Sequence, residues 1–378
     1  MNTANTVNRL RTVMAAALFG AAASSLAALP AAAEAQPSVT VNRHVTNWQS
    51  FDVPEAGPGG TSPVAMNDLG VIVGNYSDAN GVQHGFVRDA FGCITSFDPP
   101  GSQYTAPQGV NQEGVIVGNF YDAAGNSHGF QRSAHGVITV YDDPHAGGSP
   151  LNTVIRAIND FRSIVGYFTD ASGNDHGFLR KPDGSEVVID GPGSGGIFTH
   201  VGQINDRGEV GGQFFDGSGV WHALIRHPDG TLVVVDAPGA GTNGNTGTFI
   251  GFNQALNLNG EITGEYADNN NGYHGYVRFA NGTFAEFLAP HAGTNQGNGT
   301  YPASLNLCGT VVGFSYDAKG NDHAFVRFAN CGLTQFDAPE PGSQGTYPNA
   351  VNSVNLFTGT YYDANGTAHG FTAVANCK

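Results

Sequence analysis

The chain has 378 residues and a formal net charge of −16, with 55 glycines, 19 prolines and only 12% charged residues. This composition favours turns over helices, and no stretch keeps a 3.6-residue apolar period long enough to predict a helix. The acidic balance, without basic patches that interleave with aromatics, argues against nucleic acid and anionic membranes as partners, because their phosphates repel such a surface.

The first 35 residues are typical of a secretory signal peptide. Arg9 and Arg11 precede an Ala- and Leu-rich apolar run over 13–32, and small residues suit cleavage before Gln36. We therefore predict an exported protein, secreted or periplasmic, whose mature chain carries 13 basic and 30 acidic residues. An uncleaved membrane anchor is the alternative, while no second apolar run is long enough to span a membrane.

The rest of the chain, 36–378, is organised by a repeated motif: an apolar-and-Gly run, an aromatic, Asp-x-x-Gly, then His-Gly-Phe. The histidines of its seven copies lie 44 to 52 residues apart, at His84, His128, His176, His222, His274, His323 and His369. Repeats of this length are typical of propellers, and one period holds four short strands, expected over 108–111, 115–121, 128–132 and 137–142. We therefore predict a single all-β domain, a seven-bladed β-propeller of four-stranded blades.

The two ends of the chain are out of phase with the repeat. Six periods end in an outer-strand segment of the type Phe97-Asp98-Pro99, and a seventh, Phe51-Asp52-Val53-Pro54, precedes the first full repeat. After the last His-Gly-Phe the chain stops at Lys378 without one. We predict that the N-terminal strand completes the last blade, which hides the strand edges. An open solenoid is the alternative, but no polar capping repeat is visible.

The repeat also resembles a known family. His323-Ala324-Phe325, with Gly-Thr-Val-Val-Gly upstream, and its six related units are similar to the HAF family of bacterial extracellular repeat proteins. The resemblance covers essentially the whole mature chain. It implies export and a propeller-like array, and it carries over no catalytic residues.

The residues repeated in every period are interpreted as structural. Asp and Gly three residues apart suit type I turns, and one carboxylate per turn is too few for calcium, so no metal site or cofactor is predicted. Each repeated His is expected to open a strand and bond a backbone group. The Arg two residues after the aromatic is expected to pair with a carboxylate; these are Arg88, Arg132, Arg180, Arg226, Arg278 and Arg327.

The four cysteines suggest up to two disulfides in an exported protein. Cys308 and Cys331 are placed in turns on the same face of one blade, and Cys93 and Cys377 in equivalent turns of the first and last blades. We predict the pairs Cys308–Cys331 and Cys93–Cys377. A zinc site is not indicated, because no Cys-x-x-Cys or Cys–His spacing occurs.

Function is expected where the chain departs from the repeat. Arg156 is the only cation at its position in the inner strands, and it is the natural grip for a ligand carboxylate or sulfate entering the channel. A pair with a neighbouring Asp is the alternative. The candidate ligand-binding residues are Arg156, Gln108, Tyr104, Gln254 and Tyr347.

Two functions of different class remain open. The first is a secreted, monomeric, non-catalytic propeller that binds a glycan or protein through its loop face; the absence of nucleophile and metalloprotease motifs favours it. The second is a lyase or hydrolase on a uronate-containing glycan, in which Arg156 neutralises the uronate and His200, Tyr301 or His145 moves the proton. The fold cannot choose between them.

Overall fold

The computed structural model describes residues 41–148 and 150–377. This part of the chain contains 28 β-strands and no helix, so the all-β prediction is confirmed. This part of the chain therefore has no helix that could cross a membrane. The predicted signal peptide, residues 1–35, lies outside the described residues.

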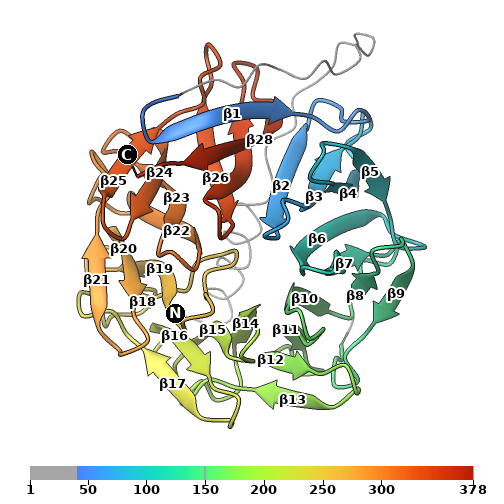
Figure 1. The fold of residues 1–378 in the computed structure, drawn as a ribbon. Coiled ribbons are helices and arrows are strands. Elements are labelled where there is room, and N and C mark those ends of the chain that lie inside the picture. The colour runs from blue at the N-terminus through green and yellow to red at the C-terminus, as the bar shows by residue number, and fades with distance from the viewer. Residues whose placement is uncertain (1–40, 149, 378) are drawn as a thin grey trace.

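The strands form groups of four antiparallel neighbours, which we call sectors and which lie side by side around a centre (Figure 1). Sector 1 contains β2 (Thr61–Met66), β3 (Ile72–Ser77), β4 (Gln83–Arg88) and β5 (Ile94–Phe97); sector 2 contains β6 (Tyr104–Val110), β7 (Ile116–Tyr121), β8 (Ser127–Arg132) and β9 (Ile138–Tyr141). Sector 3 contains β10 (Thr153–Ile158), β11 (Ile164–Thr169), β12 (Asp175–Arg180) and β13 (Glu186–Ile189); sector 4 contains β14 (Thr199–Ile204), β15 (Val210–Phe215), β16 (Trp221–Arg226) and β17 (Leu232–Val235).

The remaining strands continue the circle. Sector 5 contains β18 (Gly247–Thr248), β19 (Ile262–Ala267), β20 (Tyr273–Arg278) and β21 (Phe284–Phe287); sector 6 contains β22 (Gly299–Leu305), β23 (Val311–Tyr316), β24 (Asp322–Phe328) and β25 (Gly332–Phe336). Sector 7 combines β26 (Gly345–Val351), β27 (Leu356–Tyr362) and β28 (Ala368–Ala375) with β1 (Val45–Phe51). The first strand of each sector lies innermost, and apolar clusters fill the seams between neighbouring sectors (Figure 1).

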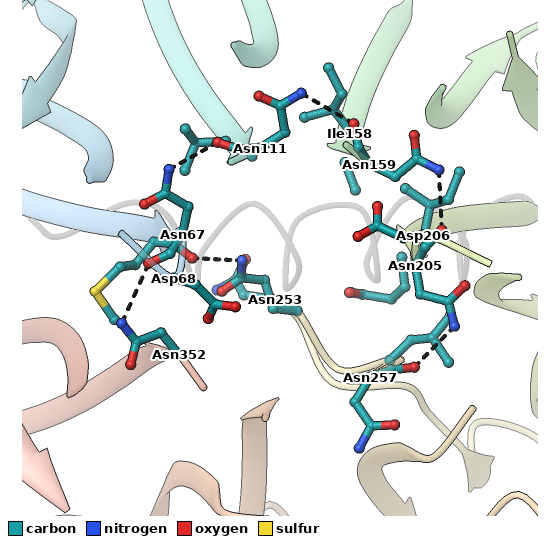
Figure 2. Close-up of a pocket in the computed structure, with 18 of the residues that line it drawn as sticks. Asn67, Asp68, Asn111, Ile158, Asn159, Asn205, Asp206, Asn253, Asn257 and Asn352 are labelled. Atoms are coloured by element: carbon teal, nitrogen blue, oxygen red, sulfur yellow. Dashed lines mark hydrogen bonds between the residues drawn. The ribbon is translucent and has the colours of Figure 1, made fainter. Parts of the chain in front are cut away.

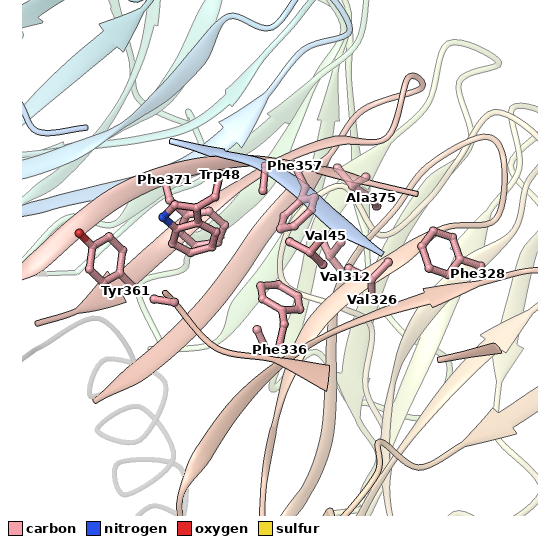
Figure 3. Close-up of a cluster of buried hydrophobic side chains, with 14 residues drawn as sticks. Val45, Trp48, Val312, Val326, Phe328, Phe336, Phe357, Tyr361, Phe371 and Ala375 are labelled. Atoms are coloured by element: carbon pink, nitrogen blue, oxygen red, sulfur yellow. The ribbon is translucent and has the colours of Figure 1, made fainter. Parts of the chain in front are cut away.

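The first and last described strands meet in sector 7. β1 pairs antiparallel with β28, so that Ser50 lies opposite Phe371 and Phe51 opposite Gly370. The Trp48 indole stacks on Phe371 with ring centroids 4.2 Å apart (Figure 3). A Cβ on Gly370 would lie 2.7 Å from the Phe51 ring, which explains why the repeated His-x-aromatic unit carries glycine here. The predicted pairing of the N-terminal strand with the last strand is confirmed.

A series of asparagines links the sectors at the turns between their first and second strands. In each turn the Asn Oδ1 accepts a backbone N–H of its own turn, as Asn111 does from Val115 at 2.9 Å. The side-chain Nδ2 then donates to the backbone carbonyl of the next Asn in the circle (Figure 2). The series runs through Asn67, Asn111, Asn159, Asn205, Asn257, Asn306 and Asn352, and Asn352 donates back to Asn67 at 3.5 Å. The sequence analysis predicts the turns but misses this link between sectors.

The repeated histidines bond carboxylates rather than the backbone groups that we expected. His128 is typical: its Nδ1 lies 2.8 Å from Asp142 at the end of the outer strand, and its Nε2 lies 3.4 Å from Asp122 in the preceding turn. The predicted Arg–carboxylate pairs are also wrong for four of the six arginines. Their guanidinium groups lie over an aromatic ring of the preceding sector, in the pairs Arg88–Phe51, Arg132–Phe97, Arg180–Tyr141 and Arg327–Phe287.

Both predicted disulfides are wrong. Cys331 pairs with Cys377, with Cα atoms 5.7 Å apart, while Cys93 and Cys308 are free and exposed. The predicted pair Cys308–Cys331 does not form because the two cysteines lie at different distances from the centre. Cys308 lies in the innermost turn of sector 6, whereas Cys331 lies in the outermost turn of the same sector, beside the end of sector 7. Cys377, at the end of sector 7, therefore pairs with Cys331 of sector 6 and not with Cys93 of sector 1.

Candidate functional site

A register shift recurs in the innermost strands, and in sectors 2 to 4 the residue at the shift lines the central cavity. In six sectors one residue of this strand has no partner in the second strand; these residues are Val64, Gln108, Arg156, Gly202, Ala303 and Asn349. Such a bulge turns a side chain out of the regular pleat. The sequence shows only the small residue that follows, so the bulge itself is a finding of the structure.

Gln108 and Arg156 line a central cavity of about 240 Å³. Arg156 Nη1 donates to Gln108 Oε1 at 3.0 Å and Nη2 donates to the Phe252 carbonyl at 3.5 Å. No ion pair to a carboxylate forms at Arg156 within the described residues, so the alternative Arg–Asp pair is not seen. Burial lowers the pKa of Arg156 from its ordinary value. The guanidinium is thus a cation held by neutral groups at the centre of an acidic protein.

The cavity is narrowed by an irregular segment of sector 5. β18 spans only two residues, and the chain after it leaves the regular strand geometry, with Gln254 at φ +44°. Gln254 Nε2 donates across the circle to the Met66 carbonyl at 2.8 Å, and Gln203 Nε2 donates to the Gly251 carbonyl at 3.1 Å. Small-molecule pockets usually exceed about 300 Å³, so this cavity is small and suits a small anionic group.

The other end of the cavity is acidic. Asp68, Asp160 and Asp206 follow members of the asparagine series and line the cavity with them (Figure 2). The Asp160 N–H donates to Asp206 Oδ1 at 2.8 Å, and burial together with the neighbouring Asp206 carboxylate raises the pKa of Asp160. An anion that reached Arg156 from this end would first pass these carboxylates.

A second group of side chains lies at the opposite, loop-side ends of the inner strands, in the seams of sectors 3 to 7. We call it the aromatic arc. Each ring contacts the next, for example Tyr273 with Tyr301 at 4.9 Å and Tyr301 with Phe314 at 5.2 Å between centroids. The arc contains Tyr167, Phe198, His200, Trp221, Phe249, Tyr273, Tyr301, Phe314, Tyr347 and Tyr362.

Six of the ten arc residues occupy two repeated strand positions. One is the residue after the buried Thr of the first strand, and the other is the residue after the Gly of the second strand; both face a seam. In sectors 4 to 7 the first position holds His200, Phe249, Tyr301 and Tyr347, whereas sectors 1 to 3 have Ser62, Ala106 and Val154. At this first position the aromatic residues are therefore confined to sectors 4 to 7. Most of these rings keep part of their surface exposed.

Carboxyl groups lie behind the arc in three of its seams. His200 Nε2 lies 3.0 Å from Asp175 Oδ2, and the Tyr347 hydroxyl donates to Asp322, whose pKa is raised by burial. Glu265 is 4% exposed and its Oε2 has no hydrogen-bond partner within the described residues. Burial raises the pKa of Glu265 to about 8, so this side chain is a neutral acid at pH 7.

The structure divides the predicted site residues into separate groups. Arg156, Gln108 and Gln254 come together in the cavity, and His200, Tyr301 and Tyr347 join the arc. Two predicted residues fall outside both groups. Tyr104 contacts Tyr121 in sector 2, with ring centroids 5.5 Å apart, and His145 lies beside Asp143.

None of the three predicted proton-transfer residues, His200, Tyr301 and His145, lines the cavity with Arg156. Tyr167 belongs to the arc, where its ring stacks on His200 with centroids 3.6 Å apart, and it also lies close to Arg156. Sequence reasoning missed Tyr167, Tyr273, Phe314 and Glu265. Comparing the residue after the repeated glycine in all second strands would have singled out three of them.

No protein-family model matches the chain, and no curated protein does so either. Solved structures do. The β-propeller domain of the Trilobed protease from Pyrococcus furiosus, described as having an open velcro topology, matches with a TM-score of 0.51 and 8% identity, over 85% of this chain and 95% of that domain. The chain has the β-propeller fold.

Two further solved structures are similar to this β-propeller. The BP39L lectin from Burkholderia pseudomallei has a TM-score of 0.53 and 11% identity, over 85% of this chain and 97% of the lectin. Puromycin hydrolase has a TM-score of 0.53 and 13% identity, over 83% of this chain and 53% of the hydrolase, so the propeller spans about half of that enzyme. At these identities the likeness is one of fold alone.

Proposed function

We propose that the chain is a seven-bladed β-propeller of the HAF-repeat type, with residues 36–378 as one exported, monomeric domain. The asparagine series that returns from Asn352 to Asn67 supports seven members, and the pairing of β1 with β28 supports a last blade built from both ends of the chain. The Cys331–Cys377 disulfide supports an oxidising compartment outside the cytoplasm.

We further propose that this propeller binds a glycan, without catalysis, through the aromatic arc. The observation that carries this proposal is the continuous series of contacting, mostly partly exposed rings through sectors 3 to 7. Sugar rings present C–H faces that stack on aromatic side chains, and their hydroxyls need hydrogen-bond acceptors nearby. Asp322, which is partly exposed and accepts the Tyr347 hydroxyl, is such an acceptor beside the rings.

The charge of the site decides which glycan class fits. The carboxyl groups of the arc and the net charge of −16 disfavour polyanionic chains. Arg156 does not offset them, because it lines the central cavity and is not a member of the arc. We therefore propose a neutral oligosaccharide as the ligand class and rank uronate polymers below it.

The test is a glycan array followed by calorimetry on the best neutral ligand. Tyr301→Ala should weaken binding about 5- to 10-fold, the loss of about 1 kcal/mol of stacking, whereas Tyr301→Phe should keep most of the affinity. Tyr121→Ala is the matched control, since Tyr121 is a partly exposed tyrosine of sector 2 outside the arc. Equal losses in the Tyr121 and Tyr301 variants, or tighter binding of uronate polymers, would contradict the proposal.

A further inference from the structure

We propose that Asp143, His145 and Glu186 form a binding site for a divalent transition-metal ion at the outer part of the seam between sectors 2 and 3. Asp143 and His145 follow β9, and Glu186 begins β13 of the next sector. One ligand atom from each side chain can be chosen so that all three lie within 4.8 Å of one another. An ion there would hold the two sectors together.

The repeat shows that both carboxylates are exceptions. At the position of Asp143 the other sectors carry small or apolar residues, namely Val53, Pro99, Gly191, Ala237, Ala289 and Ala338. At the position of Glu186, opposite the repeated Arg, they carry Ile94, Ile138, Leu232, Phe284 and Leu333. In the seam between sectors 7 and 1 the corresponding pair, Val53 and Ile94, belongs to an apolar cluster. Two independent replacements thus put a carboxylate on each side of one seam.

The burial of these carboxylates calls for a positive partner. The Asp143 side chain has no exposed surface and that of Glu186 is only 12% exposed. Glu186 Oε1 is buried and has no hydrogen-bond partner within the described residues, while Oε2 accepts the hydroxyl of Tyr141. Burying two neighbouring carboxylates is costly unless a cation lies between them. The unpaired Oε1 is the atom that faces His145.

The distances suit a metal coordinated by nitrogen and oxygen. His145 Nδ1 lies 3.1 Å from Asp143 Oδ1 and 3.6 Å from Glu186 Oε1. In a tetrahedral site with metal–ligand bonds of about 2.0–2.2 Å, ligand atoms lie about 3.4 Å apart. The His145 side chain is 59% exposed, which leaves an entry path and room for a water as fourth ligand. The mixed ligand set favours zinc over the oxygen-binding calcium and magnesium ions.

The sequence hides this site because its ligands come from positions 143, 145 and 186, with no short metal-binding spacing. Sequence reasoning assigned His145 to possible proton transfer. The structure places it instead beside two carboxylates at the outer edge of the seam, whereas Arg156 and Gln108 meet at the inner end of the same seam.

The test is zinc binding to the full mature chain after treatment with EDTA. We expect one equivalent of zinc by calorimetry and elemental analysis, and a rise of about 2 °C or more in the melting temperature. His145→Ala and Glu186→Leu should abolish both effects. Asp143→Ala with Glu186→Leu restores the residue types of the other sectors and should fold without metal.

The matched control is His291→Ala. His291 also follows the proline after an outer strand, but Ala289 stands where Asp143 would be, so this variant should bind zinc like the wild type. Absence of zinc binding to the wild type overturns the proposal, and so does zinc binding retained by Glu186→Leu. Calcium binding tighter than zinc at the same residues would overturn the assignment to a transition metal. Circular dichroism of each variant separates loss of the site from loss of the fold.

Discussion

His369 of β28 bonds Asp52, which follows β1, with its Nδ1 2.9 Å from the carboxylate. The last repeat therefore obtains its outer carboxylate from the opposite end of the chain, 317 residues away. In five of the other six sectors the equivalent pair, such as His176 and Asp190, is 14 residues apart. The geometry is the same, so the pairing of β1 with β28 reproduces a complete repeat.

Removal of this carboxylate should loosen the terminal strand. Asp52→Ala should lower the free energy of unfolding by about 0.5–1 kcal/mol, because both side chains are partly exposed and the pair is screened by water. The reverse change is available in sector 5, where Leu288 stands in place of the outer Asp beside His274. Leu288→Asp should stabilise the protein by a similar amount at pH 6. Urea denaturation checks both, and a gain in stability for Asp52→Ala would contradict this role.

Stability should be greatest in mildly acidic solution. Hydrogen bonds from Asn126 lower the pKa of Asp122 to about 2, and those from Asn321 do the same for Asp317, so these carboxylates stabilise the fold above pH 3.8 and lose that effect as the pH falls towards 2. The Asp52 hydrogen bond raises the pKa of His369, so its contribution is complete below pH 6.5 and is lost as the pH rises through the folded-state pKa.

Melting temperatures measured from pH 2 to 9 should therefore peak between about pH 4 and 6.5. The acid limb should reflect the turn aspartates and the alkaline limb the histidines. A maximum near pH 8 would be incompatible with the raised pKa of His369.

Glu265 should add to the decline on the alkaline side. Burial raises its pKa from 4.5 to about 8, so the folded state binds a proton that the unfolded state has lost, and stability falls as the pH rises from 4.5 to 8. Glu265→Gln should remove this loss and stabilise the protein at pH 8 by on the order of 3 kcal/mol. Glu55→Gln changes an exposed glutamate and serves as control. If the two variants have equal melting temperatures at pH 8, Glu265 is charged in the folded protein.

The Cys331–Cys377 disulfide should account for a large part of the stability of the C-terminal end. It closes a segment with a sequence separation of 46 residues, worth about 4 kcal/mol in the chain-entropy model. Cys377→Ser should lower the melting temperature and make it insensitive to reductant. Cys308→Ser alters a free exposed thiol and should change neither the melting temperature nor its sensitivity to reductant. A reductant-sensitive melting temperature in Cys377→Ser would point to a different pairing.

Most of the fold can be predicted from the sequence because the repeated motif marks the strands of every sector. The spacing of the histidines and the phase of Phe51-Asp52 against Lys378 are sufficient to predict the strands and the meeting of the two ends. The Arg–aromatic contacts and the His–Asp pairs were missed, since both join residues of different strands through geometry that a linear pattern does not contain. The predicted disulfide Cys308–Cys331 was wrong because the sequence shows the order of the turns within a sector but not how far each turn lies from the centre.

The candidate site was predicted only in part. Arg156 stands out in sequence as the only cation at a repeated position, and its place in the cavity follows from the bulge. The arc and the Asp143–Glu186 pair depend on side chains of neighbouring sectors that meet across a seam. Such meetings become visible only when each repeated position is compared around the whole circle.

Every link of the asparagine series points the same way, from one residue to the next along the chain and from Asn352 to Asn67. Such a loop of hydrogen bonds has no beginning, so the location of the chain's two ends is incidental to it. A circular permutant opened between any other two repeats and joined across the present ends would keep all seven links. A variant with one repeat excised would instead have to change its curvature to regain a continuous loop.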